Sequence, residues 1–232
     1  MHVLYGLRVD SAIDLPLPAV DGPSDVSICV GPVEPRGALI WEMERPFPMS
    51  CRRDGTRLIL SWPDARFAIS RDQVIVDAAD VDLAAHLLLH VVWSLVLDER
   101  GQASLHGSAV EGDVGAVAIL GPSGSGKSTA VLTMLDQGWR LVSDDLLAFV
   151  DDGRLVPGPP FVRLLEDRSA GRPGGVDVGG KLRYFPAASQ HPARLAAIVV
   201  HGDYAGEPLR LLGAQALDAL IREVYCFLPP QP

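Results

Sequence analysis

One short segment, residues 121–128, constrains this chain more than any other part of its sequence. It reads Gly-Pro-Ser-Gly-Ser-Gly-Lys-Ser and satisfies every fixed position of the pattern G-x-x-x-x-G-K-[ST]. The apolar run 116–120 precedes it and is typical of a buried strand, while residues 129–137 are compatible with a helix. We therefore predict a strand, a glycine-rich turn and a helix in direct succession.

This pattern carries a specific chemistry. Glycines let successive backbone N–H groups point at one anion, and the N-terminus of the next helix adds partial positive charge. In such a loop Lys127 reaches the β- and γ-phosphates of a nucleotide, and the Ser128 hydroxyl ligates Mg²⁺. The chain has lysine only at Lys127 and Lys181, and one of them occupies the motif position. The predicted nucleotide-binding residues are Gly121, Pro122, Ser123, Gly124, Ser125, Gly126, Lys127, Ser128 and Thr129.

Composition narrows the class of protein. The chain has 232 residues, 48% of them hydrophobic, which is enough for one large core or two smaller ones. Its formal net charge of −9 argues against nucleic acid as a partner, since such binders are usually basic. The three cysteines are far apart and lack metal-site spacing. Together with the lack of a signal peptide, this favours a cytoplasmic location.

The longest apolar stretch, residues 81–97, is interrupted by Asp82, His86 and His90. We expect a buried helix that is too short to span a membrane, capped by an aspartate at its start and ended by Gly101. The histidines are spaced i and i+4, as in a metal pair. Because no glutamate completes an H-E-x-x-H pattern and no third ligand is evident, we do not predict a metal there.

The chain is expected to hold two domains. Residues 1–80 look β-rich, with strands predicted at 3–9, 26–30, 57–62, 66–70 and 73–77 between Pro, Gly and Asp turns. Residues 81–232 have an α/β pattern. There, strands are predicted at 105–110, 116–120, 139–143, 146–150 and 195–200, helices at 129–137 and 213–225, and a mobile loop region at 157–186.

Asp144 and Asp145 follow the predicted strand 139–143 directly after the glycine loop and its helix. Phosphoryl transfer needs a carboxylate for the metal and a group that takes the acceptor's proton. Adjacent strand residues alternate in direction, so one carboxylate can face the metal and the other the acceptor. His106 lies in an apolar context before the strand 116–120. By itself a histidine in such a context is more often a core residue than a functional one.

Residues 104–149 resemble the catalytic domain of the HPr kinase/phosphorylase family. In that family a His-Gly at a strand end is followed by a G-x-x-G-x-G-K-S loop, a helix and an apolar strand ending in Asp-Asp. The corresponding residues here are His106-Gly107, the 121–128 loop, residues 130–137 and Leu141 to Asp145. Phosphoenolpyruvate carboxykinase has a similar loop and Asp pair, but this chain is far too short for that enzyme. The resemblance implies a P-loop, HPr-kinase-like core with a small β-rich N-terminal domain.

The resemblance also implies roles for individual residues. Lys127 and the loop hold ATP, Ser128 binds Mg²⁺, and His106 orients or tunes the catalytic carboxylate. Asp144 and Asp145 divide the roles of base and metal support in an order that stays open, and Asp145 is the metal candidate. Beyond residue 150 the resemblance fades. The candidate for the family's metal glutamate is Glu166, and the candidates for its phosphate-binding cation are Arg163, Lys181 and Arg183, unless these are solvated loop charges.

The opening of the chain, with Tyr5-Gly6-Leu7, Ser11 and Leu15-Pro16-Leu17-Pro18, resembles a divergent HPr-kinase-like group. In lasso peptide clusters such kinases phosphorylate the C-terminal serine of the precursor. The resemblance thus implies an ATP- and Mg²⁺-dependent serine kinase acting on a peptide or small protein. Two rivals stay open: a nucleotide-binding regulatory protein, and a small-molecule kinase or NTP hydrolase. Kinases of the family form hexamers, but no segment here demands one, so the oligomeric state stays open.

Overall fold

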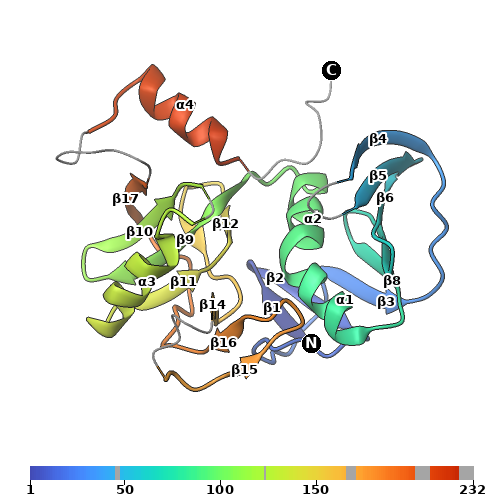
Figure 1. The fold of residues 1–232 in the computed structure, drawn as a ribbon, viewed down its shortest axis with the longest axis horizontal. Helices are drawn as coiled ribbons and strands as arrows, with labels where there is room; N and C mark the ends of the chain where they lie inside the picture. The colour runs from blue at the N-terminus through green and yellow to red at the C-terminus, as the bar shows by residue number, and fades with distance from the viewer. Residues whose placement is uncertain (45–47, 123, 166–170, 202–209, 225–232) are drawn as a thin grey trace. The chain divides into compact units, whose positions relative to one another are not determined.

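The chain is a mixed α/β protein, rich in strands and with few helices (Figure 1). The computed structural model describes residues 1–44, 48–122, 124–165, 171–201 and 210–224. Two compact units emerge: among the described residues, the first holds Met1–Gly101 and the second begins at Gln102. The division falls later than the boundary expected at residue 80, so the helical segment that begins at Val81 groups with the N-terminal strands.

The first unit is built on one sheet. In the described part of the chain it has eight strands in the order β1-β2-β3-β8-β7-β6-β5-β4. The pairs β2–β3 and β3–β8 are parallel and the other neighbours are antiparallel. The strands are β1 (His2–Leu4), β2 (Leu7–Ser11), β3 (Val26–Val30), β4 (Ala38–Met43), β5 (Met49–Asp54), β6 (Arg57–Ser61), β7 (Ala65–Ile69) and β8 (Gln73–Ala78).

Two expectations for this sheet were wrong. The single strand predicted at 3–9 is a hairpin, because Tyr5 and Gly6 have φ angles of 49° and 77° and form a tight turn. Strands β4 and β5 were missed. The strand β4 begins with the apolar run Ala38-Leu39-Ile40-Trp41, which was overlooked, and it lies at the edge of the sheet with its residues exposed or half-buried. The other predicted strands of this unit are confirmed.

A helical segment follows β8, formed by α1 (Val81–Leu87), the π-helical turn η1 (Leu88–Val92) and α2 (Trp93–Glu99). The Asp80 side chain caps it by accepting hydrogen bonds from the backbone N–H groups of Asp82 and Leu83. By length and composition alone the segment could cross a membrane, which the sequence reading had excluded. Just over half of its most apolar stretch (56%) is buried in the structure, as in the core helix of a globular unit.

The second unit is organised around β9. In the described residues its main sheet has the order β13-β12-β9-β10-β17, and β11 also pairs with β9. The strand β10 is antiparallel to β9 and parallel to β17. Its strands are β9 (Ser104–Gly112), β10 (Gly115–Leu120), β11 (Arg140–Ser143), β12 (Leu146–Phe149), β13 (Leu155–Val156) and β17 (Leu195–Val200).

Both faces of this sheet are apolar. Neighbouring residues such as Ala118 and Ile119 belong to different core clusters, because side chains alternate across a strand. The helix α3 (Lys127–Asp136) packs Val131 and Leu132 on the Ile119 face. Further along the chain, α4 (Ala214–Arg222) begins after Gly213, as predicted.

The region 157–186 was predicted to be a mobile loop, but its described residues include three short strands. It contains β14 (Val162–Leu164), β15 (Gly175–Val176) and β16 (Leu182–Tyr184), which form a small antiparallel sheet in the order β14-β16-β15. Its Gly, Pro and Arg content hid these short strands. Val162 and Leu164 are buried against the α3 face of the main sheet, which anchors the small sheet there.

The cap at Asp80 gives a test of the first unit. Replacing Asp80 with Ala should lower the free energy of unfolding by about 1 kcal/mol, because two N–H groups at the helix start lose their acceptor. Asp80→Asn keeps an oxygen acceptor and should change it by only a few tenths of a kcal/mol. Urea unfolding measures both values, and equal losses in the two variants would contradict the capping role.

Candidate functional site

The predicted succession of strand, glycine loop and helix is present. The strand β10 ends at Leu120, and α3 begins at Lys127 with Gly126 as its N-cap. Gly121, Gly124 and Gly126 have φ angles of 138°, 84° and 102°, a backbone region that other residues rarely adopt. A Cβ atom at Gly121 would lie 2.1 Å from the carbonyl oxygen of His201, so this position needs glycine for space as well.

Lys127 is held inside this loop. Its Nζ donates hydrogen bonds to the carbonyl oxygens of Gly121 at 2.5 Å and Pro122 at 3.1 Å, and the residue is buried. The Ser125 N–H donates to Pro122 O at 3.2 Å. Among the described residues, the buried Oγ of Ser125 has no hydrogen-bond partner. The predicted loop residue Ser123 lies outside the described residues.

His201, which the sequence reading did not single out, fixes the base of this loop. Its backbone N–H continues the pairing of β17 by donating to Leu120 O at 2.7 Å. Its ring Nδ1 hydrogen-bonds to the carbonyl oxygen of Ser125. The only sequence signal was its place at the end of the apolar strand predicted at 195–200.

The strand β9 brings the loop and the aspartate pair together. Gly107 pairs with Leu120, the residue before the loop, on one side. On the other side the Gly107 N–H donates to Asp145 O at 3.3 Å. A side chain at Gly107 would collide with Ile119 O at 2.8 Å and with the side chain of Leu120 at 2.5 Å. Loop and aspartates therefore flank the same residue, about two strand spacings or ~10 Å apart.

The aspartates occupy a break between two strands. Both β11 and β12 pair with β9, and Asp144 and Asp145 lie at the interruption. Asp145 has a φ of 66°, which is uncommon for a residue other than glycine and is a form of local strain often found at functional sites. The turn is closed by hydrogen bonds from Leu146 N to Asp144 O at 2.9 Å and from Ser143 Oγ to Leu146 O at 2.6 Å.

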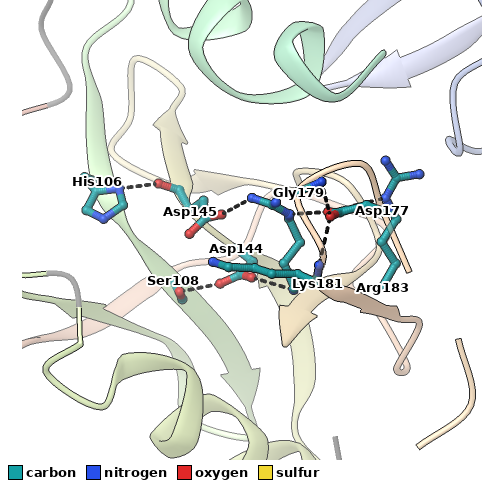
Figure 2. A network of polar contacts seen from close by, with 9 residues as sticks. His106, Ser108, Asp144, Asp145, Asp177, Gly179, Lys181 and Arg183 are labelled. Carbon is teal, nitrogen blue, oxygen red and sulfur yellow. Dashed lines mark hydrogen bonds and ion pairs between the residues drawn. The ribbon is translucent and has the colours of Figure 1, made fainter. Parts of the chain in front are cut away.

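Asp144 is the buried member of the pair. Its Oδ1 accepts a hydrogen bond from the Ser108 hydroxyl at 2.6 Å, and its Oδ2 accepts one from the backbone N–H of Arg163 at 3.1 Å (Figure 2). Burial, followed by the neighbouring charge of Asp145, raises the pKa of Asp144 to about 6. The two hydrogen bonds and the charge of Lys181 act in the opposite direction.

Asp145 is the accessible member. Its side chain is 34% exposed, and its Oδ2 lies 3.8 Å from Nη1 of Arg163. The ring Nδ1 of His106 lies 3.0 Å from the backbone carbonyl oxygen of Asp145. His106 therefore contacts the pair through the backbone of the strained residue. The role expected for His106, to orient or tune the catalytic carboxylate, stays a prediction.

Two of the site candidates predicted beyond residue 150 lie near Asp144 and Asp145. Arg163, in β14, bonds to Asp144 through its backbone and lies beside Asp145. Lys181 acts on Asp144 through its charge. Glu166, the proposed metal ligand, lies outside the described residues. In the part of the chain that the structure describes, no group of three or more His, Cys, Asp or Glu residues could hold a metal ion, at His86 and His90 or elsewhere.

Sequence reasoning missed two further members of the cluster, Ser108 and Asp177. The first had a usable signal, because a strand places residues i and i+2 on the same face, and Ser108 follows His106 at that spacing. The second had none: Asp177 lies in a Gly-rich turn far from any motif. Its side chain is fully buried and bonds to Arg163 Nε at 2.6 Å.

A scan against protein-family models found no match to this chain, and a search of curated proteins found no similar sequence.

The pKa of Asp144 predicts a pH-dependent stability. The folded pKa of about 6 exceeds the ordinary value of 3.8, so the folded state holds the proton more tightly. This contribution is fully present below pH 4 and is lost as the pH rises through 6. Relative to the unaltered protein, Asp144→Asn should therefore gain on the order of 1–3 kcal/mol of unfolding free energy between pH 4.5 and pH 7.5, without added metal.

Denaturant unfolding at several pH values measures this difference. The control is Asp152→Asn, because Asp152 is exposed and its hydrogen bonds to Arg154 lower its pKa instead. The control should show no such gain as the pH rises. A pH-independent difference between Asp144→Asn and the unaltered protein would refute the raised pKa.

Proposed function

We propose that this chain is a phosphotransferase with a P-loop core of the HPr-kinase-like kind. In this proposal it is an ATP- and Mg²⁺-dependent kinase that transfers the γ-phosphoryl group to a serine hydroxyl of a peptide or small protein. The observation that carries the proposal is the placement of the 121–128 loop and the Asp144–Asp145 pair on the two sides of Gly107. Phosphoryl transfer needs a phosphate cradle and an acidic group within a few ångströms of one phosphoryl, and this arrangement supports assigning the two roles to the loop and the pair.

The loop is the proposed nucleotide-binding element. Its glycines adopt the backbone angles that a tight anion-binding turn requires, and it leads directly into α3. Lys127 already lies against the loop, where its ammonium group donates hydrogen bonds to two backbone carbonyl oxygens. Phosphate oxygens would be stronger partners for that charge than the carbonyl oxygens it now contacts.

The residues present fit a magnesium ion bound mainly by the nucleotide. Mg²⁺ keeps several waters and is usually held by one or two carboxylates together with substrate phosphates. Ser128, in the first turn of α3, and the accessible carboxylate of Asp145 are the proposed protein ligands. When bound, the ion would neutralise charge on the transferred phosphoryl group.

The aspartate pair is the proposed proton acceptor for the serine hydroxyl. Asp144 has a pKa of about 6, near the value that suits a general base at neutral pH, while Asp145 is the carboxylate that a substrate can reach. We therefore assign the proton transfer to the pair as a unit. The resemblance to lasso peptide precursor kinases suggests the C-terminal serine of such a peptide as the acceptor and a cytoplasmic setting.

The direct test is intact mass spectrometry of a serine-containing peptide encoded beside the gene, incubated with the protein, ATP and Mg²⁺. We expect the peptide to gain one phosphate. Lys127→Ala should lower the rate by at least about a hundredfold, because it removes a cation aimed at the transferred phosphoryl group.

Two aspartate variants provide the controls. Asp145→Asn should bind nucleotide with near-normal affinity yet transfer little phosphate, since the loop that holds ATP stays intact. Asp152→Asn, an exposed aspartate on the β12–β13 turn, should behave as the unaltered protein does. Nucleotide binding without transfer to any serine would favour a regulatory protein, and transfer to a metabolite would favour a small-molecule kinase.

A further inference from the structure

Asp177 is a buried carboxylate to which the proposed mechanism gives no role. Its side chain has no exposed surface. Its Oδ1 accepts hydrogen bonds from the backbone N–H groups of Gly179 at 2.9 Å and Lys181 at 3.1 Å, and its Oδ2 accepts one from Arg163 Nε at 2.6 Å (Figure 2). Burying a charge is costly unless it is paired and hydrogen-bonded. We therefore ask what the fully buried and hydrogen-bonded carboxylate of Asp177 contributes to the protein.

Arg163 lies between two carboxylates and is held more closely by Asp177. The hydrogen bond from its Nε to Asp177 is 2.6 Å long, whereas its Nη1 lies 3.8 Å from Oδ2 of Asp145. Charge-assisted hydrogen bonds near 2.7 Å are about twice as strong as neutral ones, and a looser ion pair contributes less. The side chain of Arg163 is 11% exposed, which limits the other positions open to it.

Arg183 adds a second positive charge beside Asp177. Its Nε lies 4.0 Å from the same Oδ2 and has no hydrogen-bond partner among the described residues. Its guanidinium group also lies 5.5 Å from the ring centre of Phe161. Asp177 thus lies beside two arginines and makes the weaker contact with the second one.

We propose that Asp177 is a positioning residue: it holds the Arg163 guanidinium beside Asp145 without letting it close onto that carboxylate. This inference rests on the proposed function and adds a part to the same site. With Nε bound to Asp177, the guanidinium keeps its charge near the reacting phosphoryl group while its Nη1 stays 3.8 Å from the Asp145 carboxylate. Through Gly179 and Lys181 the same carboxylate shapes the turn that carries Lys181 toward Asp144.

Asp177→Asn separates the holding of Arg163 from the shaping of the turn at residues 177–181. The amide oxygen can still accept from Gly179 and Lys181, while the amide NH₂ group faces the Arg163 Nε–H, and two donors cannot bond. Arg163 should then pair with Asp145. We expect kcat for peptide phosphorylation to fall at least about tenfold, because small misplacements of catalytic groups lower rates by such factors. The KM for ATP should stay within about twofold of normal.

Two comparisons decide whether Asp177 acts through Arg163. Asp152→Asn is the matched control, because Asp152 also accepts from a backbone N–H and an arginine Nε but lies on an exposed turn. It should leave kcat unchanged. In an Arg163→Gln background, Asp177→Asn should lower kcat little further, because the arginine through which Asp177 acts is already absent. An unchanged kcat in Asp177→Asn, or losses that simply add in the double variant, would overturn the proposal.

A second readout needs no catalysis. In NMR spectra the Nε–H of Arg163 should exchange slowly with water in the unaltered protein and in Asp152→Asn, and rapidly in Asp177→Asn. Fast exchange in the unaltered protein would overturn the proposal. If the Arg163 Nε–H exchanges slowly but the protein phosphorylates no serine peptide, the Asp177–Arg163 contact would be supported and the proposed function would be refuted.

Should Asp177→Asn fail to fold, Arg163→Lys tests the same point, since lysine keeps the charge but not the two-sided reach of a guanidinium. We expect the same loss of kcat with the KM for ATP retained. Full activity in Arg163→Lys would contradict the proposal.

Discussion

The close packing of the β9 backbone at Gly107 is the constraint on which the candidate site depends. The absence of a side chain there lets β10 lie against one side of β9, while the Gly107 N–H bonds to Asp145 on the other. The residues on either side of Gly107 also contact the aspartate pair: His106 contacts the Asp145 carbonyl, and Ser108 contacts the Asp144 carboxylate. Three consecutive residues of one strand thus fix the aspartate pair and the end of the strand that leads into the loop.

The site combines strain with buried charge, both of which oppose stability. Asp145 holds a left-handed backbone conformation, and Asp144 is a carboxylate whose charged form is disfavoured by burial. Such features persist when surrounding contacts determine them, and they concentrate where function requires a fixed geometry. Here the surrounding contacts come from β9, from β14 and from the 177–181 turn. The small sheet β14-β16-β15 is therefore part of the site's framework.

The sequence was most informative where one motif or one apolar run decided the structure. The 121–128 pattern predicted the strand, loop and helix around it, and the apolar runs predicted β3, β10, β12 and β17 closely. Contacts between segments that are far apart in the sequence could not be predicted from it. Nothing in the residues around Asp177 indicates that its carboxylate meets Arg163, because the pairing of β14 with β16 brings them together. The hairpin at Tyr5 and Gly6 was missed because its tight turn lies within an apolar run.

The most direct test of the account asks whether a nucleotide bound to the loop also lies beside the aspartate pair. A paramagnetic Mn²⁺ complex of a non-hydrolysable ATP analogue, titrated into isotope-labelled protein, would report this through NMR line broadening. The account predicts strong broadening of the backbone amide signals of Lys127, Gly107 and Asp145, and little at Gly153, beyond the far end of β12. Broadening at Lys127 with sharp signals at Gly107 and Asp145 would contradict it.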